Sequence, residues 1–217
     1  MIAKKTVALA IAAMFLAPAL SVAQLPKVPS LGGSSSNSSG GGDAAAQQDQ
    51  LVRAYVAADK EVLNAQAKMA DAVGLKDRAA QLQATSDALG AGATKENLEQ
   101  SETMQSEASQ EIQAKLKEGN VKLDNAGKKK FADGLGTLGR GIAKYAALKG
   151  PIANFQSAIT GGGAAAALGA ASKLNAGRYI VSSTPGHMKN LSNTLNTAVS
   201  YAKSNDIPVP ADATAAL

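Results

Sequence analysis

Residues 131–146 read F-A-D-G-L-G-T-L-G-R-G-I-A-K-Y-A, and two different folds compete to explain them. Gly134, Gly136 and Gly139 spell G-x-G-x-x-G, the fingerprint of dinucleotide-binding domains. That fingerprint needs a buried strand before the glycines and an acidic residue about 20 positions after them. Residues 128–133 read K-K-K-F-A-D, which does not resemble a buried strand, and no carboxylate follows at the required spacing. We therefore predict no nucleotide site and no cofactor.

The same stretch has the periodicity of an amphipathic helix. At 100° per residue its apolar side chains form one stripe, made of Phe131, Leu135, Leu138, Ile142 and Ala146. Gly127, Gly134 and Gly141 recur every seventh residue along one shoulder of this stripe, and Gly139 lies on the other. Each glycine costs about 1 kcal/mol of helix propensity relative to alanine, so a close neighbouring helix should compensate for it. We predict that these four glycines are helix-packing positions; the alternative is a helix broken at 134–136.

The chain beyond residue 43 is helical in its periodicity. Thr184 and Pro185 form a favourable helix start, because the hydroxyl can cap the helix and proline fits its first position. Aromatic residues make up only 3% of the chain, which disfavours a β-sandwich. We predict an all-α fold, a single helical bundle of five or six helices over residues 43–204 with a C-terminal tail over 205–217. The apolar residues recur at helical spacing over 51–73, 75–89, 94–119, 125–149, 152–181 and 184–204.

Residues 1–23 have the features of a cleaved signal peptide. Lys4 and Lys5 form a basic start, residues 7–16 are apolar, and Ser21-Val22-Ala23 places small residues before a cleavage site. The alternative is a retained N-terminal anchor. Residues 24–42 are rich in proline, glycine and serine, which predicts a flexible linker. We therefore expect a periplasmic or secreted protein, and the absence of cysteine excludes thiol chemistry and cysteine-ligated zinc.

The two halves of the predicted bundle carry opposite charge. Residues 43–118 hold 8 basic and 13 acidic residues, whereas residues 119–217 hold 11 basic and 4 acidic ones. One interpretation is that the halves attract each other; the other is that the basic half binds an anionic partner. For such a partner we predict a patch at Lys128, Lys129, Lys130 and Lys144.

The predicted partner is an envelope protein or an anionic envelope component, meaning lipid, lipopolysaccharide or polysaccharide. Export and the scarcity of aromatic side chains for stacking both disfavour nucleic acid. Self-association into a homo-oligomer stays open.

Residues 150–172 carry no charged side chain. Small residues recur every four positions in this segment, among them Gly162 and Ala166, in the pattern of closely packed helices. We predict that both are helix-packing positions in a buried helix or hairpin of the bundle. The alternative is an element that inserts into a membrane after a conformational change, because its length is sufficient for a span.

Two polar residues fall on apolar helix faces. Asp59 lies near the centre of the apolar face over 51–73, and a buried carboxylate must be paired or hydrogen-bonded. We predict a structural ion pair with Arg140 or Arg178 rather than a catalytic acid. His187 is the only histidine, so it cannot form a multi-histidine metal site, and we expect it to be a partly exposed packing residue.

These observations together predict a non-enzymatic protein without catalytic, metal or cofactor sites. Its expected role is a binding, scaffolding or assembly component at the cell envelope or outside the cell. The alternative is a membrane-active helical protein that uses residues 150–172 and the basic second half against anionic lipid.

Overall fold

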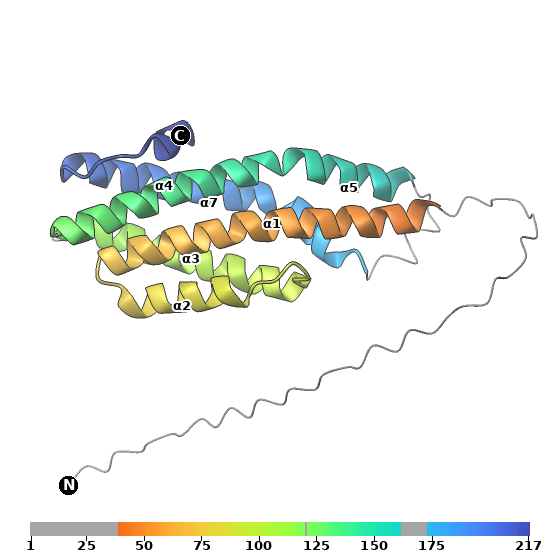
Figure 1. Cartoon of the computed structure of the whole chain (residues 1–217), viewed down its shortest axis with the longest axis horizontal. Helices are drawn as coiled ribbons and strands as arrows, with labels where there is room; N and C mark the ends of the chain where they lie inside the picture. Colours follow the sequence, from red (N-terminus) through yellow and green to blue (C-terminus); the bar gives the residue numbers. More distant parts are fainter. Residues whose placement is uncertain (1–38, 120, 162–172) are drawn as a thin grey trace, which may run out of the picture. The chain divides into compact units, whose positions relative to one another are not determined.

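The computed structural model describes residues 39–119, 121–161 and 173–217, and these residues form helices and no strand (Figure 1). The all-α helical-bundle class is therefore confirmed for this part of the chain. The predicted signal peptide and most of the predicted linker lie outside the described residues. The helices are α1 (Ser39–Ala72), α2 (Lys76–Ala88), α3 (Lys95–Lys117), α4 (Asn125–Ala147), α5 (Lys149–Gly161), α7 (Asn175–Ser204) and α8 (Ala211–Ala215).

Local sequence signals account for the helix ends. Thr94 caps α3, because its Oγ1 accepts a hydrogen bond from the Asn97 backbone N–H at 3.4 Å while the Asn97 side chain accepts from the Thr94 N–H. The Asp124 carboxylate caps α4 by accepting from the Gly127 N–H at 2.7 Å. α1 begins at Ser39, inside the linker predicted over 24–42.

α1 is the central helix and contacts α2, α3, α4, α5 and α7. Against α4 its backbone comes close at two glycines. A Cβ atom added at Gly134 would lie 2.6 Å from Met69 Cγ and 3.1 Å from the Ala65 carbonyl oxygen. One added at Gly141 would lie 2.7 Å from Val62 Cγ2. α4 is continuous through 134–136, so these glycines allow close packing instead of breaking the helix.

Two predictions for α4 are not met, namely the packing of Gly127 against a neighbouring helix and the burial of Ala146. Gly127 contacts its own capping residue Asp124 rather than a neighbouring helix. Ala146 was expected in the apolar stripe but is exposed. The four other members of the stripe are buried, namely Phe131, Leu135, Leu138 and Ile142.

The segment 205–217, predicted as a tail, packs onto α4. A Cβ atom at Gly139 would overlap the backbone of Asp212 and Ala213 in α8. Ile207 and Ala213 are buried, and Arg140 on α4 holds the Asp212 carboxylate at 3.0 Å. The second glycine shoulder of α4 therefore receives the end of the chain.

The predicted helix start at Thr184 and Pro185 is wrong. α7 begins at Asn175 and continues through Pro185, and the Thr184 hydroxyl donates to the Ile180 carbonyl one turn earlier. Ile180, Thr184 and His187 are all buried on one face of the helix. Packing of that face keeps the helix intact, although proline removes one backbone hydrogen bond.

No helix in the described ranges is long and apolar enough to cross a membrane. Residues 162–172, which include Gly162 and Ala166, lie outside the described residues. The described part of the segment 150–172, predicted as a buried helix or hairpin, belongs to α5, which lies at the surface and buries only Phe155.

Candidate functional site

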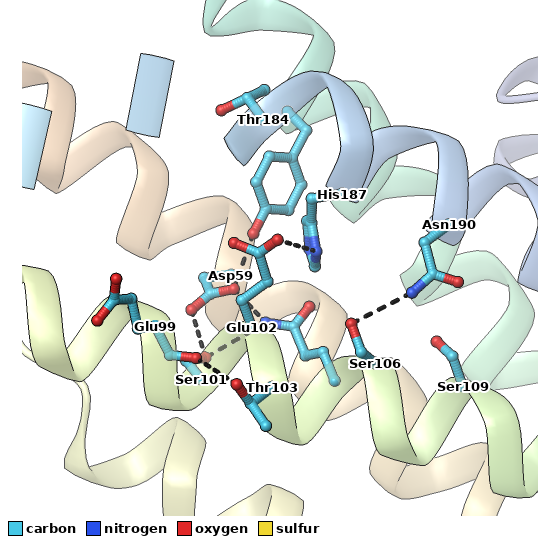
Figure 2. A network of polar contacts seen from close by, with 12 residues as sticks. Asp59, Glu99, Ser101, Glu102, Thr103, Ser106, Ser109, Thr184, His187 and Asn190 are labelled. Carbon is cyan, nitrogen blue, oxygen red and sulfur yellow. Dashed lines mark hydrogen bonds and ion pairs between the residues drawn. The ribbon is translucent and has the colours of Figure 1, made fainter. Parts of the chain in front are cut away.

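Asp59 on α1 is completely buried and accepts three hydrogen bonds (Figure 2). The Ser101 hydroxyl on α3 donates to Oδ2 at 2.5 Å, and the Tyr145 hydroxyl on α4 donates to Oδ1 at 2.7 Å. The side-chain amide of Gln105 on α3 also donates to Oδ1. Neutral donors from two helices thus surround the carboxylate.

The ion pair predicted for Asp59 is therefore corrected. Arg140 lies on the outer side of α4 and binds Glu61 at 3.1 Å and Asp212 at 3.0 Å. Arg178 is exposed on α7. Both arginines remain in contact with water, which avoids the cost of burying a guanidinium. Hydroxyl and amide groups satisfy the carboxylate at lower desolvation cost.

His187 on α7 lies beside the same cluster. It was expected to be partly exposed, but it is only 2% exposed because it lies on the inward face of α7. Its Nδ1 is 3.8 Å from a carboxylate oxygen of Glu102, and its ring centre is 5.1 Å from that of Tyr145. Neither ring nitrogen has a hydrogen-bond partner among the described residues. Glu102 in turn accepts from the Tyr179 hydroxyl. We refer to the following residues as the buried network: Asp59, Ser101, Glu102, Gln105, Tyr145, Tyr179 and His187.

The buried network contains two carboxylates and no lysine or arginine. Burial raises the pKa of Asp59, although hydrogen bonds from Ser101, Tyr145 and Gln105 and the nearby His187 act against this shift. Burial lowers the pKa of His187, although Glu102 and Asp59 oppose that shift. The neutral imidazole is thus the favoured form in the folded protein, and adding a proton there places a charge in a nearly water-free site.

A groove of about 650 Å³ lies between α1, α2 and α4, away from the buried network. Four lysines line it, two from α4 and one each from α1 and α2, together with two aspartates and several alanines. These residues are Lys68, Lys76, Lys129, Lys130, Asp71, Asp133, Gln83, Ala67, Ala79, Ala80 and Ala126. We call it the basic groove.

The charges in the basic groove do not cancel. Lys130 pairs with Asp71, and Lys68 donates to the Thr137 hydroxyl at 3.2 Å. Lys76 and Lys129 are exposed and form no ion pair with any described residue. Two ammonium groups therefore remain available to an anion.

The four lysines predicted as an anion-binding patch are divided by the fold. Lys129 and Lys130 line the basic groove, whereas Lys128 does not. Lys144 pairs with Glu61 of α1 at 2.7 Å. Sequence reasoning missed Lys68 and Lys76, because they lie in the acidic half and reach the groove only through tertiary packing.

Ion pairs also connect the two oppositely charged halves. Glu61 of α1 binds both Arg140 and Lys144, and Asp71 binds Lys130. The opposite charges of the two halves therefore partly neutralise each other within the bundle.

A comparison with protein families, curated proteins and solved structures found no match to this chain.

Proposed function

We propose that the protein is an exported, non-enzymatic binding component of the cell envelope and that the basic groove is its ligand site. The observation that carries this proposal is the convergence of four lysines from three helices on one groove. Such a concentration of ammonium groups attracts anions. The features of residues 1–23 support export.

The lining favours an anionic amphiphile over other anions. Alanine side chains from three helices provide apolar surface next to the ammonium groups. A lipid or lipopolysaccharide presents a phosphate or carboxylate beside an apolar portion, which matches both features. Among the described residues no aromatic side chain lines the groove, and they therefore offer no stacking surface for a nucleobase.

Replacing Lys76 and Lys129 with glutamine together should weaken binding of a soluble anionic amphiphile by about two- to thirty-fold. The reason is that each exposed ammonium–anion contact contributes about 0.2–1 kcal/mol. Titration calorimetry of the mature protein with a short-chain phosphatidic acid measures the change. A short-chain phosphatidylcholine, which has no net charge, should bind weakly in comparison.

The matched control is Lys203→Gln, since Lys203 is exposed near the end of α7 and does not line the groove. Its affinity should stay at the wild-type value. Because the control removes one charge and the groove variant removes two, a loss of binding free energy in Lys203→Gln of half the groove variant's loss or more would show a general charge effect and contradict the proposed site.

Export makes a separate prediction about the N-terminus. The chain isolated from a bacterial envelope fraction should begin at Gln24, because Ala23 completes the small-residue cleavage pattern. N-terminal sequencing tests this directly. A chain that begins at Met1 and stays in the cytoplasmic fraction would contradict export, independently of any ligand measurement.

A further inference from the structure

The basic groove contains carboxylates as well as ammonium groups. Four lysines and two aspartates line it. A carboxylate next to a bound phosphate repels that phosphate, so a site that binds a simple anion gains nothing from it. The two aspartates therefore restrict which anionic ligands fit the groove.

The two aspartates differ in their partners. Asp71 of α1 pairs with Lys130 of α4, so these two charges neutralise each other. Asp133 of α4 is exposed and forms no ion pair with any residue that the structure describes. One uncompensated carboxylate therefore lines the groove together with the available ammonium groups of Lys76 and Lys129.

The opposite charges follow an order along the groove. Lys129 and Asp133 are four residues apart on α4, so they lie one turn apart on the same side of the helix. Lys76 opens α2 just after the end of α1, and Asp71 at that end of α1 pairs with Lys130. Lys76 therefore lies at the Lys129 end of the groove. A ligand in the groove meets ammonium groups first and, one helical turn further along α4, a carboxylate.

A head group with a phosphate and a primary ammonium matches this order. In phosphodiesters of serine and ethanolamine, an ester oxygen and two carbons separate the phosphorus from the nitrogen, a span comparable to the helix pitch of about 5.4 Å. The phosphate can bind Lys76 and Lys129 while the ammonium donates to the Asp133 carboxylate. An anion without an ammonium places negative charge near Asp133 and leaves the repulsion uncompensated.

We infer that the basic groove selects the head group of an aminophospholipid and that Asp133 recognises its ammonium group. This inference rests on the proposed function, because it requires that a phosphate binds the lysines of the groove. It is also more specific than the proposed function, because net charge alone does not distinguish an aminophospholipid from another anionic lipid.

Two short-chain lipids of equal net charge test this selection. Phosphatidylserine and phosphatidylglycerol each carry one net negative charge, but only phosphatidylserine carries an ammonium group. Their affinities for the mature protein are measured by titration calorimetry, with each lipid below its critical micelle concentration. A chelator is present so that no divalent cation bridges the phosphate and a carboxylate. The wild-type protein should bind phosphatidylserine more tightly than phosphatidylglycerol.

Asp133→Asn isolates the contribution of the ammonium group. The ratio of the phosphatidylserine affinity to the phosphatidylglycerol affinity should fall by about 1.4- to five-fold, the range expected for one exposed ammonium–carboxylate contact. The carboxylate of phosphatidylserine is present in both measurements, so its contribution cancels when the ratios of the two proteins are compared. Because the Asp133 side chain is exposed, the melting temperature should stay at the wild-type value.

The matched control is Asp77→Asn. Asp77 is exposed on α2, does not line the groove and forms no ion pair with a described residue. This variant changes the net charge by the same amount and should keep the wild-type affinity ratio. A ratio that falls equally in both variants, or that Asp133→Asn leaves unchanged, would overturn the inference. Tighter binding of phosphatidylglycerol by the wild type would overturn it as well.

The same titrations separate this inference from the proposed function. Binding of both lipids with a ratio independent of Asp133 would contradict the selection and leave the proposed function intact. Glycerophosphoserine, the head group without acyl chains, should bind more weakly than phosphatidylserine. Equally tight, Asp133-dependent binding of glycerophosphoserine would support recognition of the head group and contradict the amphiphilic ligand of the proposed function. Binding of neither lipid would contradict both.

Discussion

Replacing Gly134 with leucine should lower the free energy of unfolding by about 3 kcal/mol or more, because the substitution overpacks the α1–α4 contact. The added Cβ would lie 2.6 Å from Met69 Cγ, and the remaining atoms of leucine need space that α1 occupies. The Ala65 carbonyl oxygen, 3.1 Å from that Cβ, is backbone and cannot rotate away. Urea unfolding followed by circular dichroism measures the loss.

Gly150 provides the matched control for Gly134. It lies in the first turn of α5, and no heavy atom comes within 4 Å of an added Cβ. Gly150→Leu should therefore change stability by no more than about 1 kcal/mol, because the gain in helix propensity is offset by the restriction that Pro151 places on a preceding residue with a Cβ. Equal stability of the Gly134 and Gly150 variants would contradict close packing of α4 against α1.

Replacing Asp59 with alanine should lower the free energy of unfolding by about 3 kcal/mol or more. The substitution removes the acceptor for Ser101, Gln105 and Tyr145, and each buried donor without a partner costs about 1–3 kcal/mol. Asp59→Asn keeps one carboxamide oxygen as an acceptor and should lose less. Asp87→Ala is the exposed control and should stay within about 0.5 kcal/mol of wild type.

The pH dependence of these variants provides a second measurement. Burial raises the pKa of Asp59 above 3.8, so its contribution to stability is complete below that value and is lost as the pH rises through the folded-state pKa. The asparagine side chain does not titrate. The stability difference between wild type and Asp59→Asn should therefore shrink as the pH rises. A difference that grows with pH would show that the carboxylate is more stable in the ionised form.

The helical class could be predicted from the sequence because helix formation leaves a local pattern. The apolar residues of 131–142 recur with helical spacing, and the lysines before the glycines already argued against a strand. The burial of Asp59 was predicted for the same reason, since its position on an apolar face depends only on its near neighbours. The capping signal at Thr94 is equally local and forms a capping box.

The residues that contact Asp59 could not be identified from a local sequence pattern. Ser101 and Gln105 gave no sign that they meet Asp59, because hydroxyl and amide groups are common on exposed helix faces as well. The arginines were expected on grounds of charge alone, but their helix faces point elsewhere. The continuity of α7 was missed because Thr184 and Pro185 match the local pattern of a helix start. Burial of Ile180, Thr184 and His187 on one face keeps the helix continuous across that pattern.

Local sequence was therefore sufficient for the helical class, the glycine shoulders of α4 and the burial of one carboxylate, because each depends on residues within a few turns. The packing of the bundle was needed to bring Lys68, Lys76 and Lys129 to one groove and to place His187 beneath α3. These arrangements depend on how whole helices align, which is set by many small packing contributions summed along the chain. The alignment of whole helices therefore cannot be predicted from any short stretch of the sequence.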